Sequence, residues 1–281
     1  MYIVYNNRTY RGACHHMFLL KLFETLGDHA LYYFNQAGRM GIFLFNVVLS
    51  VFRPPYYKIF NITKQVYVIG ALSIFVILFT GAFTGMVLGL QGYNTLKKFG
   101  SEGLLGSAVA LSLIRELGPV LAALMVTGRA GSAICAEIGI MRNSEQIDAL
   151  ECMAIDPHKY IVAPKFIATI ISMPLLTAIF NVVGIFGGYL VGVKLLGSNE
   201  GAYFASMYKD VEFDDVYMGF VKSLCFGLLI VWICAAKGYL VHFERKGGFG
   251  AEGVSRVTTY AVVLTSVAIL VFDYFITSFL I

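Results

Sequence analysis

The sequence predicts an all-α membrane protein with an N-terminal interfacial helix and about five membrane-spanning helices. Apolar residues make up 58% of its 281 residues and charged residues only 14%, whereas soluble domains average roughly 45–50% and 25%. The apolar residues also fall in long runs, and a helix needs about 20 such residues to cross the hydrocarbon core of a bilayer. Finally, the basic residues gather between alternate runs, as they do in multi-pass membrane proteins.

The N-terminal region divides into an extension and an amphipathic segment. Residues 1–17 differ in character from the rest of the chain, so we expect a disordered extension, and Met17 is a candidate start. Over residues 18–50, apolar residues recur at spacings of three and four, with charged residues opposite. This pattern predicts a helix in the membrane interface; a cytosolic helix packed on a partner is the alternative. Pro54 and Pro55 then end the segment.

The first predicted span, over about residues 66–90, carries no charge and has a strip of glycines. Gly81, Gly85 and Gly89 follow one another at intervals of four. Such a strip lets a second membrane helix approach closely, so we predict a packing face suited to oligomerisation. The alternative is that glycine is simply more frequent in membrane helices.

The second predicted span, over about residues 104–127, holds Arg115 and Glu116 near its middle. A charge at mid-membrane costs at least about 2.5–3.5 kcal/mol, so such side chains face a cavity or a partner. Neighbouring residues on a helix diverge and pair poorly, so we expect each to have its own partner. Pro119 permits a kink. A purely structural ion pair with another helix, such as the one carrying Asp273, is the alternative.

A short helix is predicted between the second and third spans, over about residues 144–153. Ser144 suits its N-cap, Glu145 its first turn, and Asp156-Pro157 a stop soon after it. The remaining spans are expected over about 166–195, 216–236 and 257–280, and the last contains Asp273.

The basic residues predict the orientation. With the N-terminus in the cytoplasm, the inner segments hold fifteen Lys and Arg residues and the outer loops four. This positive-inside bias places the N-terminus and the 144–153 helix in the cytoplasm.

Several familiar motifs are absent or out of context. Residues 248–253 match G-x-G-x-x-G but lie between two predicted membrane helices, where a dinucleotide site has no supporting strand. The sequence has no P-loop, no set of catalytic residues and no metal-ligand spacing. We therefore expect no catalytic residue, metal site, cofactor or nucleic-acid partner in this chain. A permease driven by a separate motor protein fits these features.

Five segments together resemble the MlaE family of ABC permeases: GAFTGMVLGLQGY (81–93), LSLIRELGPVLAALMVTGRAGSAICAEIGIM (111–141), EQIDALECMAIDP (145–157), PLL (174–176) and GVSRVTTYAVV (253–263). The resemblance covers about residues 18–280. It implies a homodimer in the inner membrane, assembled with an MlaF-like ATPase that binds ATP, a STAS-type MlaB-like protein and a hexamer of MCE-domain MlaD-like proteins. Its substrate would be glycerophospholipid, moved between inner and outer membranes to maintain lipid asymmetry.

The resemblance also implies roles for particular residues. Arg115 and Glu116, with Asp273 as the third intramembrane charge, would lie near a lipid cavity between the two copies. A coupling helix would enter a groove on the ATPase, and it would comprise Glu145, Gln146, Ile147, Asp148, Ala149 and Leu150. Two other functions stay open: a permease that exports another hydrophobic solute or confers toluene tolerance, and a non-transporting membrane anchor for a periplasmic complex.

Overall fold

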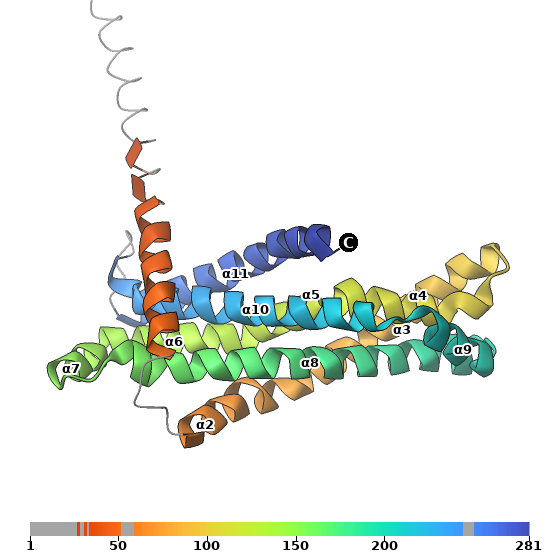
Figure 1. Ribbon diagram of the computed structural model, residues 1–281, viewed down its shortest axis with the longest axis horizontal. Coiled ribbons are helices and arrows are strands. Elements are labelled where there is room, and N and C mark those ends of the chain that lie inside the picture. Colours follow the sequence, from red (N-terminus) through yellow and green to blue (C-terminus); the bar gives the residue numbers. More distant parts are fainter. Residues whose placement is uncertain (1–26, 29–30, 33, 52–58, 244–249, 281) are drawn as a thin grey trace, which may run out of the picture. The chain divides into compact units, whose positions relative to one another are not determined.

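The structure is a computed structural model that describes residues 27–28, 31–32, 34–51, 59–243 and 250–280 (Figure 1). The expected extension over 1–17, the candidate start at Met17, and the first residues of the predicted interfacial helix lie outside the described residues. So do the first two residues of the 248–253 motif. The described residues form helices and turns and contain no β-strand. The predicted all-α class is confirmed.

The chain forms two compact units, residues 1–45 and 46–281. Residues 34–51 are helical, and the boundary between the units falls within this helix. Large apolar side chains are exposed along the described part of the first unit, at Leu31, Phe34, Ile42 and Phe45. An interfacial location of this helix stays a prediction.

The second unit contains the membrane-spanning helices. Its α-helices are α2 (Ile59–Ile69), α3 (Ile74–Lys98), α4 (Leu105–Ser112), α5 (Gly118–Val126), α6 (Ser132–Asn143), α7 (Gln146–Cys152), α8 (Ala163–Tyr189), α9 (Glu200–Asp210), α10 (Phe213–Tyr239) and α11 (Gly250–Leu280). Among the described residues, five helical stretches are long and apolar enough to cross a membrane: Phe60–Lys98, Glu102–Asn143, His158–Leu195, Phe213–Tyr239 and Gly250–Leu280. The protein is therefore a multi-pass membrane protein.

The first two of these stretches are interrupted in their interior by turns that are not α-helical. A 3₁₀ turn, Ala71–Ser73, separates α2 from α3. There the Arg129 guanidinium donates to the Val68 carbonyl oxygen and to the Ser73 hydroxyl, 3.1 Å away. In the second stretch, π-helical turns at Leu113–Leu117 and Thr127–Gly131 separate α4, α5 and α6. Such turns shift the side chains beyond them and are frequent at functional sites.

The glycine strip of α3 packs against α8 of the same chain. A methyl group built on Gly85 would lie 1.8 Å from the Gly184 carbonyl oxygen, and methyl groups built on Gly81 and Gly89 would lie 3.1 and 2.9 Å from carbonyl oxygens of α8. Figure 1 shows α3 and α8 lying together. The strip is therefore a helix-packing face, but it is occupied within the chain, and the suggestion that it serves oligomerisation is wrong.

The short helix α9 closes one end of the unit. Its Tyr203 is 1% exposed and donates from its hydroxyl to the Ile185 carbonyl oxygen at 3.1 Å. The backbone of Gly106 lies directly against Tyr203, which leaves no room for a side chain there. Burial raises the pKa of Tyr203 to about 12. Tyr203 thus holds α9, which lies outside the membrane-spanning stretches, closely against α4.

Helix α10 is the central contact of the unit, because it packs against α5, α6, α8 and α11. In the most apolar 18-residue segment of α11, only 11% is buried inside the protein, compared with 61% in the corresponding segment of α10. The polar side chains of α10 must therefore find partners inside the protein, and this requirement shapes the site.

Candidate functional site

The π-helical turn at Leu113–Leu117 presents the two charges of the second span to different helices. Arg115 Nε lies 2.5 Å from Asp215 Oδ1, in the first turn of α10. The Arg115 side chain is 49% exposed and that of Asp215 only 6%. Asp215 also accepts a hydrogen bond from the Glu212 backbone N–H at 3.0 Å, within a capping box that begins α10. Asp215 thus links the start of α10 to the second span.

Glu116 belongs to a second, deeper group. Lys222 of α10 is fully buried, and its Nζ lies 2.5 Å from Glu116 Oε2 and 3.0 Å from Asp273 Oδ1 of α11. The Asp273 contact has ion-pair distance, although Asp273 Oδ1 is not aligned for a hydrogen bond. We call Glu116, Lys222 and Asp273 the ion cluster. It joins the second, fourth and fifth spans.

Thr277, one turn beyond Asp273, completes the surroundings of the ion cluster. Its hydroxyl lies 2.8 Å from the Asp273 carbonyl oxygen and 3.4 Å from Glu116 Oε1. With one cation and two carboxylates, the fully ionised cluster has a formal charge of −1. The Glu116 side chain is 40% exposed, Asp273 21% and Lys222 not at all. The surplus negative charge is therefore on the accessible side of the cluster.

The expectation that Arg115 and Glu116 diverge to separate partners matches this geometry. Glu116 and Asp273 do lie together, but through Lys222, which the sequence reasoning missed along with Asp215. Lys222 is the sole charged residue in the predicted span 216–236. The rule that singled out Arg115, that a lone intramembrane charge needs a partner, would have found it.

The predicted inner-loop helix is α7, Gln146–Cys152. The expectation that Ser144 caps it is wrong, because the Ser144 hydroxyl donates to the Ile140 carbonyl oxygen at the end of α6. Glu145 is the N-cap instead, with a left-handed backbone at φ 58°. This conformation turns the chain sharply between α6 and α7, at a strain cost of about 1 kcal/mol for a residue with a Cβ.

Helix α7 is attached to the unit by one apolar and two polar contacts. Ile147 is fully buried, Asp148 Oδ1 lies 2.6 Å from Arg142 Nη1, and the Tyr239 hydroxyl donates to Glu151 Oε1 at 3.3 Å. The opposite side of α7 is exposed: Glu145, Gln146, Ala149 and the residues 151–156. Leu150 is half-buried. A firmly attached helix with an exposed outer side can serve as a docking element.

Comparison with known proteins identifies the family to which this chain belongs. Residues 62–279 match the family model of the permease MlaE. The intermembrane phospholipid transport system permease protein MlaE of Haemophilus influenzae is 41% identical over 262 residues, covering 92% of this chain and 97% of its own. A probable ABC transporter permease of Rickettsia bellii is 44% identical over 92% of this chain and 97% of its own. The chloroplastic protein TRIGALACTOSYLDIACYLGLYCEROL 1 of Arabidopsis thaliana is 33% identical over 78% of this chain and 61% of its own. With five membrane-spanning helices and a family match that runs from the first of them to the last, this chain belongs to the MlaE permease family.

Proposed function

We propose that this chain is the permease subunit of an ABC complex that moves glycerophospholipid between the inner and outer membranes of a bacterium and so maintains outer-membrane lipid asymmetry. The phospholipid part is supported by the Haemophilus influenzae relative, whose name assigns that transport to it and which aligns with this chain over nearly its full length. The observation that carries the proposal is the ion cluster, with a wholly buried Lys222 and a partly exposed Glu116.

An ion cluster of this kind is costly in a span whose only task is anchoring. Burying charges away from water carries a penalty of several kcal/mol per ion, which pairing offsets only in part. A purely apolar core would hold the helices together at least as well. A transport role supplies a reason for the cost, since Glu116 and Arg115 can engage the polar headgroup of a lipid whose acyl chains lie against apolar helix faces.

The chain itself would hydrolyse no ATP, and a separate MlaF-like ATPase would bind the nucleotide. We place its docking site on the segment Glu145, Gln146, Ile147, Asp148, Ala149 and Leu150, with Ile147 holding the segment to the permease and the exposed residues meeting the motor. The positive-inside bias supports this location, because it puts α7 and the N-terminus in the cytoplasm.

Helix α10 can connect the motor to the ion cluster. It carries Asp215, Lys222 and Tyr239, and Tyr239 contacts Glu151 of α7. From Lys222 to Tyr239 the helix rises roughly 25 Å at 1.5 Å per residue. A displacement of α7 by the ATPase would therefore reach the ion cluster through one continuous helix and change its affinity for lipid.

We further propose that the permease acts as a homodimer with MlaD-like and MlaB-like partners in the inner membrane. Helix α11 is the least buried of the five spans and yet carries Asp273, and a second copy packed on this helix would keep that charge away from lipid. Asp273 on this helix would bring the ion cluster close to the cavity between the copies.

Complementation tests the proposed function. Expression of this chain in Haemophilus influenzae that lacks its own permease should restore both resistance to detergent and the normal absence of phospholipid from the outer leaflet. Restored assembly of the complex without restored lipid asymmetry would instead assign the chain to anchoring and contradict the proposal.

A further inference from the structure

Arg129 is a cation in the second membrane-spanning stretch that pairs with no carboxylate among the described residues. Its Nη1 donates to the Val68 carbonyl oxygen and to the Ser73 hydroxyl, 3.1 Å away, and both acceptors are neutral. The next acidic residue along the helix, Glu137, already has a cation, because Lys165 Nζ lies 2.6 Å from its Oε2. The charge of Arg129 is therefore held in place but not neutralised.

The other nitrogens of the Arg129 guanidinium, Nε and Nη2, donate to no described residue. The side chain is half-buried, and neither nitrogen is among the buried polar atoms without a partner, so both keep accessible surface. The adjacent Gly128 is exposed, and a methyl group built on it would have nothing within 4 Å. A guanidinium presents such donors as a planar fork that matches two oxygens of a phosphate.

An apolar groove begins one helical turn from Arg129. It lies between α3 and α5, has a volume of about 320 Å³, and is lined by Phe79, Thr80, Phe83, Thr84, Leu121 and Met125. Met125 is four residues before Arg129, and Thr80 is seven residues after Ser73. Residues at these spacings share a helix face, so both helices place the guanidinium and its partner at the same end of the groove.

The groove runs from Arg129 toward the middle of the bilayer. With the N-terminus in the cytoplasm, the first span leads outward and the second leads inward, so Arg129 and Ser73 lie closer to the inner surface than the groove does. A phospholipid of the inner leaflet has the same direction, with its phosphate at the inner surface and its acyl chains toward the centre. A soluble phosphate would pair with the cation but leave the apolar groove unfilled.

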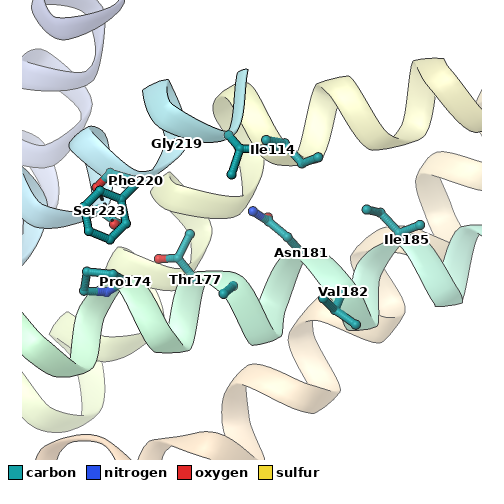
Figure 2. Close-up of a pocket in the computed structure, with 11 residues that line it drawn as sticks. Ile114, Pro174, Thr177, Asn181, Val182, Ile185, Gly219, Phe220 and Ser223 are labelled. Carbon is teal, nitrogen blue, oxygen red and sulfur yellow. Dashed lines mark hydrogen bonds between the residues drawn. The ribbon is translucent and has the colours of Figure 1, made fainter. Parts of the chain in front are cut away.

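The cavity shown in Figure 2 makes a useful contrast, because none of the described residues that line it is charged. It lies between α8 and α10, and the unpartnered oxygens of its Thr177 and Asn181 are buried. Its Ser223 hydroxyl already donates to the Phe220 carbonyl oxygen at 2.7 Å. That wall selects no particular occupant, whereas the groove beside Arg129 has an accessible cation at one end.

We propose that Arg129 binds the phosphate of a phospholipid from the inner leaflet, with Nε and Nη2 as donors and an acyl chain of the lipid in the groove between α3 and α5. The Val68 carbonyl oxygen and Ser73 hold the guanidinium in position. The site is distinct from the ion cluster, since Arg129 follows Glu116 by 13 residues, roughly 20 Å of helix. Lipid binding here does not require transport, so this proposal and the proposed function can fail independently.

Photolabelling of the full-length protein in detergent micelles tests the proposal. The probe is a phosphatidylglycerol with a diazirine in one acyl chain. The competitors are dioleoylphosphatidylglycerol, dioleoylglycerol, which lacks the phosphate, and glycerol 3-phosphate, which lacks the acyl chains. We expect labelled peptides from α3 and α5, and competition by dioleoylphosphatidylglycerol about 10- to 100-fold stronger than by either of the others, as hydrogen bonds to a charged group imply.

Two results in the unmodified protein would overturn the proposal. Equal competition by dioleoylglycerol would show that the phosphate is not recognised, and equal competition by glycerol 3-phosphate would assign the cation to a soluble anion. Absence of labelling from both α3 and α5 would equally contradict it, because the groove would then be covered by protein, such as a second copy of this chain.

Four variants separate the site from general lipid contact. Arg129→Gln removes the charge and should equalise the two dioleoyl competitors, while Arg129→Lys, which keeps a cation, should retain part of the preference. Leu121→Trp fills the groove and should abolish labelling, whereas Leu175→Trp, at a 59% exposed residue of α8 that does not line the groove, should leave it unchanged. A preference that survives Arg129→Gln, or labelling that survives Leu121→Trp, would refute the site. The competition in the unmodified protein decides the question even if a variant fails to fold.

Discussion

Lys222 Nζ lies 2.5 Å from Glu116 Oε2, although the two residues are 106 positions apart in the chain. The lysine is fully buried and the glutamate is 40% exposed. The cation is therefore available to no solvent or ligand, whereas its partner can be reached from outside. This asymmetry assigns a structural task to Lys222 and leaves Glu116 able to interact with a lipid.

Replacing Lys222 by Met should destabilise the protein by about 3 kcal/mol, because it leaves Glu116 and Asp273 as neighbouring carboxylates without their cation. Thermal unfolding of the purified protein in detergent measures the loss. The neutral triple variant Glu116→Gln, Lys222→Met, Asp273→Asn should recover most of the stability but not lipid transport. Full transport by this triple variant would refute a functional role for the ion cluster.

Arg115→Ala should reduce lipid transport while the protein keeps nearly its normal stability, because the half-exposed guanidinium contributes little to folding. Asp215→Ala should cost more stability, about 1–2 kcal/mol, since it also removes the capping box of α10. Transport by the reconstituted complex and thermal unfolding of each variant together distinguish the effect of Arg115→Ala from that of Asp215→Ala. Unchanged transport in Arg115→Ala would count against headgroup contact.

Reversal of charge at both Glu145 and Asp148, by substitution with lysine, should detach the ATPase from the permease. The change removes two carboxylates from the proposed docking segment and replaces the salt bridge to Arg142 with a repulsion between two cations. Copurification of the ATPase with tagged permease is the measurement. Glu252→Lys is the matched control, because Glu252 is an exposed carboxylate on α11 whose ion pair is with Arg256 of the same helix. Equal copurification of both variants would exclude α7 as the docking helix.

Tyr239→Phe should weaken coupling without loss of the ATPase. The substitution removes the hydroxyl that donates to Glu151 but keeps the ring that packs on His158, 4.9 Å between centroids. We expect ATP hydrolysis to continue while lipid moved per ATP falls about two- to fivefold, as the loss of one hydrogen bond implies. Tyr217→Phe, at an exposed tyrosine of the same helix, should change neither quantity.

Gly85→Ala should prevent normal folding, because its methyl group would overlap the Gly184 carbonyl oxygen and force α3 away from α8. Gly128→Ala is the control: nothing lies within 4 Å of the new methyl group, so the higher helix propensity of alanine should stabilise the protein by up to about 1 kcal/mol. Membrane yield and thermal unfolding measure both effects. Comparable stability of the two variants would show that α3 and α8 do not pack through the glycine strip.

The sequence alone determined the membrane class, the approximate number of spans and the presence of costly charges at Arg115 and Glu116. These properties depend on composition and on distances along one helix, because a span must be about 20 apolar residues long whatever it contacts. The short helix between the second and third spans could also be located, from its local stop signal Asp156-Pro157, although its N-cap could not. A left-handed Glu145 depends on how α6 and α7 meet, not on local preference.

Only the tertiary structure decided which residues are partners. Lys222 lies between Glu116 and Asp273 because α10 packs against both the second span and α11, and no pattern within one helix records that arrangement. The glycine strip illustrates the same limit. Its spacing predicted close helix packing correctly, but any smooth helix face could have met it, inside the chain or on a second copy. The choice of α8 depends on the shape of both helices together, because Gly184 and Gly188 present backbone where Gly85 and Gly89 need it.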